Sequence, residues 1–245
     1  NTIRTSDDYY NVVSGVDGKY KISESDTLIA QALVSTTEYP TGFADQFCYG
    51  DTLTDCSDKA NTDVQCEFGN CQFTELFNRS NHQEEFSGTA YNVEYTHDAE
   101  NWLVEVSYEQ FDKDFRADLG FIDQVDNQEF TLLTGYKWYG ELDDWWYDFY
   151  INGQYEIEHT NNGELLEKSL AVSSGFSGPM LSYVDILLSH ADKTGKRHNE
   201  SLLAITNNST LFSENQIELY GDIQPHKQFK MNMLAIFGDK IDYTN

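Results

Sequence analysis

Apolar and polar residues alternate along the stretch DDWWYDFYINGQYEIEHT, residues 143 to 160. The odd positions hold a mainly apolar set, Trp145, Tyr147, Phe149, Ile151, Gly153, Tyr155 and Ile157. The even positions hold a more polar set, Asp144, Trp146, Asp148, Tyr150, Asn152, Gln154, Glu156 and Glu158. Because successive side chains of a strand point to opposite faces, this period of two predicts a β-strand.

The length of this stretch permits two interpretations. The alternation holds for about 13 residues, whereas strands of soluble proteins run to about 5–6 residues. Tilted by about 45°, such a strand rises about 28 Å, close to the thickness that a transmembrane β-strand crosses. In a membrane strand, the lipid-facing set would be Trp145, Tyr147, Phe149, Ile151, Tyr155 and Ile157, with Trp145 and Tyr155 as aromatic girdle residues. The lumen-facing set would be Asp144, Asp148, Glu156 and Glu158. Alternatively, the odd face packs on a second sheet of a soluble sandwich.

The same alternation recurs along the rest of the chain. It predicts strands over 9–22, 26–35, 89–97, 101–110, 129–140, 143–160, 163–176, 180–190, 200–209, 215–223 and 227–238. Turn sequences such as TNNGE, residues 160 to 164, separate neighbouring segments as hairpins require. No window shows helical periodicity. The sequence therefore predicts an all-β chain, folded as an antiparallel up-and-down β-barrel of outer-membrane type in a single domain, 1–245.

One long insertion, residues 36–84, interrupts this regular pattern. It holds all four cysteines, Cys48, Cys56, Cys66 and Cys71, separated by seven, nine and four residues. Zinc sites usually bring cysteines in closer pairs, so two disulfides in an oxidising compartment are predicted, with their pairing open. One long loop beside short turns is typical of outer-membrane barrels, although a soluble Greek-key protein can also carry one.

Composition narrows the classes of partner. The chain of 245 residues has 42 acidic against 15 basic residues, a net charge of −27, which argues against binding a nucleic-acid backbone. This charge is compatible with divalent cations, cationic partners or a polar pore. The aromatic content of 14% with only 3 prolines favours strands. No apolar run reaches about 18 residues, so no transmembrane helix is predicted.

The stretch FRADLGFIDQVDNQEFTLLTGYKWYG, from Phe115 to Gly140, resembles a bacterial family. The matching residues are Phe115, Leu119, Gly120, Phe121, Asp126, Tyr136, Lys137 and Trp138, and the segments 14–20 and 237–245 follow the family's order. The family joins an N-terminal domain like family-nine carbohydrate-binding modules to a C-terminal, outer-membrane-like β-barrel domain of unknown function. This chain departs from the family at Asp123 and Gln124, where a basic residue is usual, and in its cysteine-rich insertion.

The resemblance implies a membrane barrel, and implies no catalytic residues. Because the family's barrel continues past a segment like IDY, the chain is expected to be part of a barrel that other residues or a partner chain complete. An open barrel would leave an unpaired edge, which neither lipid nor water tolerates well.

Three groups of polar residues could carry chemistry other than that of a membrane barrel. On the predicted strand Asp144 and Asp148 would lie about 13 Å apart along one face, too far for a glycosidase pair, while a pair drawn from different strands stays open. The acidic loop residues Asp51, Asp55, Asp58 and Asp63 could bind Ca²⁺, but they lack EF-hand spacing, and solvated charge is the simpler interpretation. The six histidines form no HxH or HExxH motif.

We therefore expect a non-enzymatic protein of the bacterial outer membrane, acting in anchoring, surface display or ligand passage. No cofactor is predicted apart from the Ca²⁺ alternative. The expected partners are outer-membrane lipid and lipopolysaccharide, a saccharide, and a chain that completes the barrel. The alternative is a secreted, soluble β-sandwich that binds or hydrolyses carbohydrate.

Overall fold

A computed structural model describes residues 2–6, 9–40, 85–120, 122, 124–198 and 204–240. These residues form a single antiparallel sheet in which every strand pairs with its neighbours in the chain. The eleven strands are β1 (Thr2–Ser6), β2 (Tyr9–Lys21), β3 (Asp26–Glu38), β4 (Phe86–Asp98), β5 (Trp102–Phe111), β6 (Asn127–Tyr139), β7 (Asp148–Thr160), β8 (Leu165–Gly178), β9 (Ser182–His198), β10 (Ala204–His226) and β11 (Phe229–Gly238).

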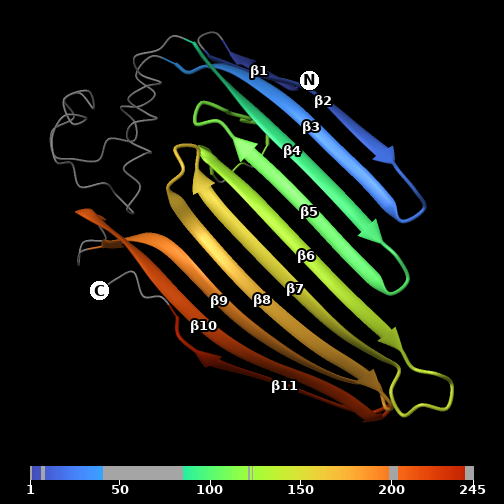
Figure 1. Cartoon of the computed structure of the whole chain (residues 1–245). Helices are drawn as coiled ribbons and strands as arrows, with labels where there is room; N and C mark the ends of the chain where they lie inside the picture. The colour runs from blue at the N-terminus through green and yellow to red at the C-terminus, as the bar shows by residue number, and fades with distance from the viewer. Residues whose placement is uncertain are drawn as a thin grey trace.

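The sheet is curved, with β1 at one edge and β11 at the other (Figure 1). Among the described strands, β1 and β11 do not pair with each other, so the sheet is open. The predicted all-β, antiparallel, up-and-down topology is confirmed, and the described sheet is open, as expected for part of a barrel; the outer-membrane type stays a prediction.

The two ends of the sheet differ in their connections. At the end that we call the short-turn end, the connections are 22–25, 99–101, 140–147, 179–181 and 227–228. At the opposite, long-loop end, residues 39–85 and 112–126 make the two longest connections. Residues 41–84, which include the four cysteines and the four Ca²⁺ candidates, lie outside the described residues.

Four strand predictions differ from the structure, and one of them, 180–190, continues to His198 in β9. The strand predicted over 143–160 begins only at Asp148, because residues 140–147 form a turn in which the Gly140 amide donates to the Tyr147 carbonyl at 2.8 Å. The Asp144 carboxylate closes this turn by accepting from the Glu141 amide at 2.8 Å. The segments predicted over 200–209 and 215–223 belong to one long strand, β10. The short strand β1 was not predicted.

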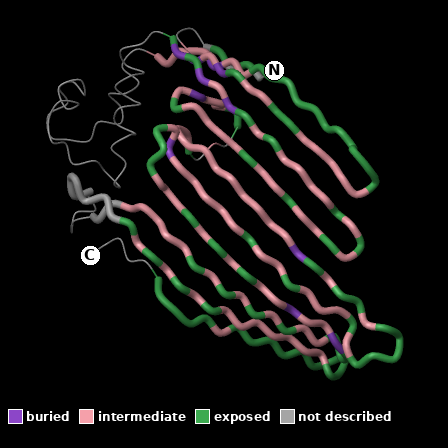
Figure 2. The backbone as a smooth tube through the Cα atoms, viewed as in Figure 1, coloured by how far each residue is buried: buried purple, intermediate pink, exposed green. Residues whose placement is uncertain are grey.

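Little of the described sheet has a conventional core. Its only buried apolar residues are Phe86, Ala90 and Phe115. Buried residues gather at the long-loop ends of β2 to β4, and the rest of the sheet is mostly intermediate or exposed apart from Gly135, Thr160, Gly175 and Gly178 (Figure 2). The sheet is therefore held mainly by its hydrogen-bonded ladders rather than by packing against another layer.

The buried cluster forms because part of the β5–β6 connection folds back over β2 to β4. We call this part, residues 112–118, the latch. Phe115 has no exposed surface, and it packs so close to β4 that a Cβ on Gly88 would lie 2.1 Å from the Phe115 amide nitrogen. The Arg116 amide donates to the Ser35 hydroxyl on β3 at 2.9 Å. Only glycine at position 88 leaves the latch this room.

Asn11 on β2 fixes the far end of the latch. Its side-chain amide donates to the Thr37 hydroxyl at 2.8 Å and to the Arg116 carbonyl at 3.0 Å, and its oxygen accepts from the Asp118 amide at 3.1 Å. The Tyr39 hydroxyl donates to the Asp118 carboxylate at 3.2 Å. Burial and the negative charge of Asp118 raise the pKa of Tyr39, so this hydroxyl remains a donor. The buried polar groups of Asn11 are therefore satisfied, as buried amides must be.

Candidate functional site: two opposed faces

From β4 to β10 the sheet largely separates apolar from polar side chains, although Leu103, Leu133 and Leu187 lie among the polar ones. Residues paired in register lie on the same face, so the face can be followed from strand to strand. On β4 to β10 the side that we call the apolar face carries Tyr91, Val93, Tyr95, Trp102, Val104, Val106, Tyr108, Phe130, Leu132, Tyr136, Trp138, Phe149, Ile151, Tyr155, Ile157, Leu170, Val172, Phe176, Val184, Ile186, Leu188, Ile217 and Leu219. We call the other side the polar face.

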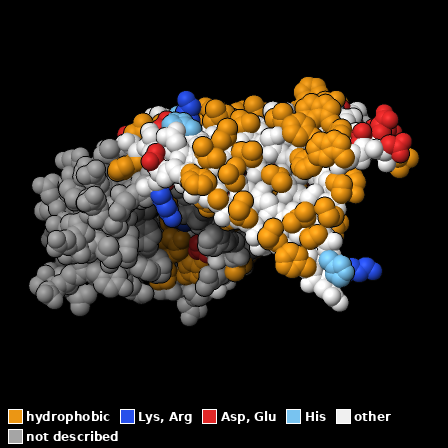
Figure 3. Space-filling view, turned by 90° about the horizontal axis from the view of Figure 1, so that it is seen from below, with side chains coloured by type: hydrophobic (Ala, Val, Ile, Leu, Met, Phe, Trp, Pro, Cys, Tyr) orange, Lys and Arg blue, Asp and Glu red, His pale blue; other side chains and the backbone are white. Residues whose placement is uncertain are grey.

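The apolar face is the more exposed of the two. On β8, Leu170 and Val172 are 52% and 42% exposed, whereas Ala171 between them is half-buried. The same alternation continues on β9, where Ile186 is exposed and the neighbouring Asp185 is half-buried. Figure 3 shows apolar side chains spread over the outer surface seen from below. This order is the reverse of that in a water-soluble sheet, which hides its apolar side.

The apolar face forms a belt of limited height. On β7 it runs from Phe149 to Ile157, nine residues, which at a tilt of about 45° corresponds to a height of about 20 Å. At the short-turn end the belt is bordered by rings in contact: Trp138 lies 5.3 Å from Phe149 between ring centroids. At the long-loop end, Gln128 pairs with His159 just beyond Ile157, so the face becomes polar there.

Four of the residues predicted to face lipid lie on the apolar face: Phe149, Ile151, Tyr155 and Ile157. Trp145 and Tyr147 instead belong to the β6–β7 turn, where they are 71% and 54% exposed. The Trp145 ring lies 5.4 Å from that of Phe176 on β8, so it still contacts the belt from beyond the strand end.

Three of the residues predicted to face a lumen lie on the polar face: Asp148, Glu156 and Glu158. Asp144 lies in the β6–β7 turn and closes it. Tyr155, predicted to lie at a membrane interface, sits inside the belt, opposite Leu132 and Leu170.

A row of four glutamates crosses the polar face near the long-loop end. Glu109, Glu129, Glu158 and Glu167 are paired in register on β5, β6, β7 and β8. Lys193 on β9 ends the row with an ion pair to Glu167 at 3.0 Å. Like charges directly opposite one another destabilise a sheet, so this row is maintained at a cost in stability.

Polar neighbours support part of the glutamate row. The Glu158 carboxylate accepts from the side-chain amides of Gln124 and Asn127, each at 2.8 Å. The Thr131 hydroxyl donates to Glu129 at 3.0 Å. Within the described ranges, no three His, Cys, Asp or Glu side chains are arranged to hold a metal ion. The row is a strip of four carboxylates with one ammonium at its end.

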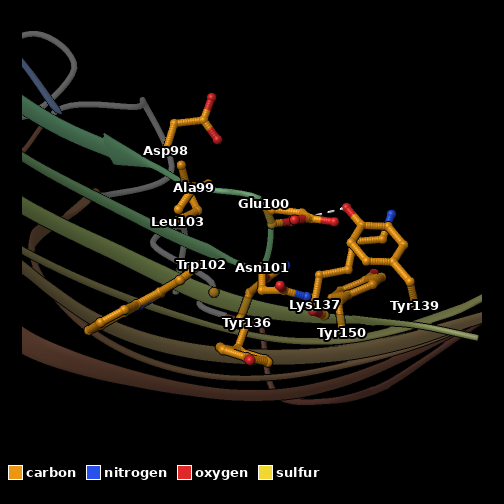
Figure 4. Close-up of a pocket in the computed structure, with 12 residues that line it drawn as sticks. Asp98, Ala99, Glu100, Asn101, Trp102, Leu103, Tyr136, Lys137, Tyr139 and Tyr150 are labelled. Carbon is orange, nitrogen blue, oxygen red and sulfur yellow. Dashed lines mark hydrogen bonds between the residues drawn. The ribbon is translucent and has the colours of Figure 1, made fainter. Parts of the chain in front are cut away.

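A cavity of about 250 Å³ opens at the short-turn end, between the β4–β5 turn and strands β6 and β7 (Figure 4). The Tyr139 hydroxyl reaches the turn by donating to the Glu100 carbonyl at 3.2 Å. The Lys137 ammonium lies 5.1 Å from the centre of the Tyr139 ring and 3.5 Å from the Asp148 carboxylate. Asn101 and Asn152 also line the cavity. Its lining thus combines four aromatic residues, two amides, a paired ammonium and two acidic residues, Asp98 and Glu100.

Next to the cavity, the polar face carries a group of tyrosines. The Tyr150 hydroxyl lies 2.5 Å from that of Tyr183 and also donates to Asp185. The rings of Tyr183 and Tyr220 are 6.0 Å apart between centroids. The sequence analysis did not predict this group. The signal that could have revealed it is that each of these tyrosines lies two residues from an aspartate, on the same face of its strand.

The described residues contain no helix that is long and apolar enough to cross a membrane. Comparison of the chain with protein-family models, with curated proteins and with solved structures found no match.

Proposed function

We propose that the chain forms the sheet of an outer-membrane β-barrel that acts as an anchor or a path for ligands, rather than as an enzyme. The observation that carries this proposal is the reversed exposure of the two faces, with apolar side chains such as Val172 outside and polar ones inside. Lipid is the solvent in which an outward apolar face has no cost in free energy.

The dimensions agree with this proposal. Five strands, β2, β3, β4, β6 and β7, have 13 residues each, longer than the 9–11 or so that a tilted strand needs to span a bilayer. The apolar belt of about 20 Å approaches the apolar band of about 25 Å found on outer-membrane barrels. Aromatic rings such as Trp138 and Phe149 border it, as the girdles of such barrels do.

A soluble sandwich accounts less well for the same face. It would require a second sheet packed over Val172, Ile186 and their neighbours about 10 Å away. All the described strands belong to a single sheet, so no such layer is formed by the described part of the chain. The binding or hydrolysis of carbohydrate by a sandwich therefore has no structural support beyond the sequence pattern.

The open edges bear on the proposed partners. Among the described strands, β1 and β11 each pair on one side only, and lipid does not tolerate an unpaired strand edge. Further strands, from another segment or a partner chain, would pair with both edges and enclose the polar face. The glutamate row would then line the interior and favour passage of cationic or neutral solutes over anions.

Refolding into lipid tests this proposal. Unfolded protein in urea is diluted into vesicles of didecanoylphosphatidylcholine, and separately into buffer. We expect protease protection and β-sheet circular dichroism with vesicles, and aggregation without them. The proposal would be overturned if the chain folds and stays monodisperse in buffer and gains no protease protection from the vesicles.

A further inference from the structure

We propose that the polar face carries a binding site for a neutral saccharide at the short-turn end. The site is built on four tyrosines, Tyr139, Tyr150, Tyr183 and Tyr220, which we call the tyrosine band. They lie on β6, β7, β9 and β10, so the band crosses the sheet perpendicular to the strands. This inference goes beyond the proposed function, because it concerns the polar face whether or not the apolar face meets lipid.

The register interleaves these tyrosines with aspartates. Asp148 on β7 is paired with Tyr139 on β6, and Asp222 on β10 is paired with Tyr183 on β9. Asp185 on β9 is paired with Tyr220 on β10. The band thus offers ring surfaces with hydrogen-bonding groups between them. This arrangement suits a pyranose, because the C–H faces of the sugar pack on aromatic rings and its hydroxyls require hydrogen-bond donors and acceptors.

Glycines make room for the band. A Cβ on Gly175 would lie 2.4 Å from the Tyr150 ring, so this ring lies directly over the β8 backbone. A Cβ on Gly135 would lie 2.1 Å from the Asn152 side-chain oxygen, which lies over β6 in the same way. The side chains of Tyr150 and Asn152 therefore lie flat on the sheet, and both line the cavity of about 250 Å³. Its volume is close to the lower bound of about 300 Å³ for small-ligand pockets.

The hydroxyl network holds the rings in place before any ligand binds. The Tyr150 hydroxyl is fixed between Tyr183 and Asp185, and the Tyr139 hydroxyl is fixed on the Glu100 carbonyl. Tyr139 nevertheless remains 52% exposed. Tyrosine loses little conformational entropy on binding, and rings that are already fixed lose less still.

Two of the three carboxylates of the band are ion-paired and the third is hydrogen-bonded, which favours a neutral ligand over a cation. Asp148 is 3.5 Å from the Lys137 ammonium, and Asp222 is 2.8 Å from that of Lys230. Asp185 accepts from the Tyr150 hydroxyl. Each of the three carboxylates therefore has a donor. Cationic ligands are better suited to the glutamate row, where four carboxylates have a single lysine at one end.

Equilibrium binding to the refolded full chain in detergent micelles tests the site, by calorimetry with maltohexaose, cellohexaose and mannohexaose, and with spermine as a cationic probe. We expect at least one hexasaccharide to bind. Tyr183→Ala and Tyr139→Ala should each weaken this binding by about tenfold. Tyr155→Ala, which removes a tyrosine from the apolar face of β7, should leave it unchanged. Tyr139→Ala removes one hydrogen bond, to a turn carbonyl, and the contact of a half-exposed ring with Lys137, so it keeps the test valid if Tyr183→Ala fails to fold.

Absence of binding by all three hexasaccharides would overturn the inference, as would saccharide binding that both band variants leave unchanged. Binding of spermine alone would also overturn it and would assign the polar face to cations. Because the assay needs no bilayer, saccharide binding by a chain that does not enter vesicles would refute the proposed function and leave this inference standing.

Discussion

A charge placed at the centre of the apolar belt tests the assignment of the two faces most directly. Val172 on β8 is exposed on the apolar face, and its neighbour Ala171 is half-buried on the polar face. Val172→Arg and Ala171→Arg therefore introduce the same side chain into the same strand, one residue apart, but on opposite faces.

The expected magnitude follows from the position of Val172 in the belt. Val172 is paired with Gly153, which lies four residues from Phe149 and four from Ile157. Each border is thus about 13 Å away along the strand, or about 9 Å in depth at a tilt of about 45°. Arginine at a bilayer midplane costs about 2–4 kcal/mol. The ratio of folded to unfolded protein should therefore fall by about 30-fold to 1,000-fold in Val172→Arg.

Ala171→Arg should cost much less, because its partners in register, Gln154 and Ser189, are polar and the arginine can reach water. The measurement is reversible urea unfolding in didecanoylphosphatidylcholine vesicles, followed by tryptophan fluorescence. Equal losses of stability in the two variants would refute the assignment of the faces. A larger loss in Ala171→Arg would reverse it.

Three further predictions concern the latch and the glutamate row. Phe115→Ala should destabilise the fold by about 3–5 kcal/mol, because Phe115 is fully buried, and equilibrium unfolding measures this loss; a loss below about 1 kcal/mol would contradict its role. Gly88→Ala should destabilise the fold by about 1–3 kcal/mol, because the new Cβ pushes against the Phe115 backbone. The control Gly18→Ala, which has nothing within 4 Å of the new Cβ, should change stability by less than about 0.5 kcal/mol. Equal effects of the two substitutions in unfolding titrations would argue against the latch. Glu129→Gln should stabilise the sheet by about 0.2–1 kcal/mol at low ionic strength, and added salt should reduce this gain. A stability difference that is independent of salt would show that the row is not under repulsion.

Most of the strand order could be predicted from the sequence because each strand separates apolar from polar residues. In β7, the alternation from Phe149 to Ile157 is regular enough to fix both the strand and its faces. The prediction was wrong where period two continues into a turn: Trp145 and Tyr147 keep the parity of β7, but Asp144 closes a turn before the strand begins. Parity alone does not distinguish a strand from a turn with alternating residues.

The latch and the tyrosine band could not be predicted in the same way, because both depend on contacts between distant strands. Phe115 lies in a polar connection without periodicity, and only its packing against Gly88 explains its burial. The tyrosines of the band belong to strands whose register decides which rings meet. For the latch, the nearest signal in the sequence was the family resemblance carried by residues around Phe115. For the tyrosine band, it was the occurrence of tyrosines among aspartates at the polar positions of the strands.

The latch also has a consequence for the order in which the chain folds. Neighbouring strands pair through short connections at the short-turn end, but the Asn11 contacts with Arg116 and Asp118 join residues 105 and 107 positions apart. Loop-closure entropy delays contacts of such separation until the strands between them are paired. A slip of one residue in any of these pairings would turn Asn11 toward the apolar face, out of reach of the latch. We therefore expect the latch to close last in this half of the sheet, and only over strands in the correct register; its protection from hydrogen exchange should appear after that of β3 and β4.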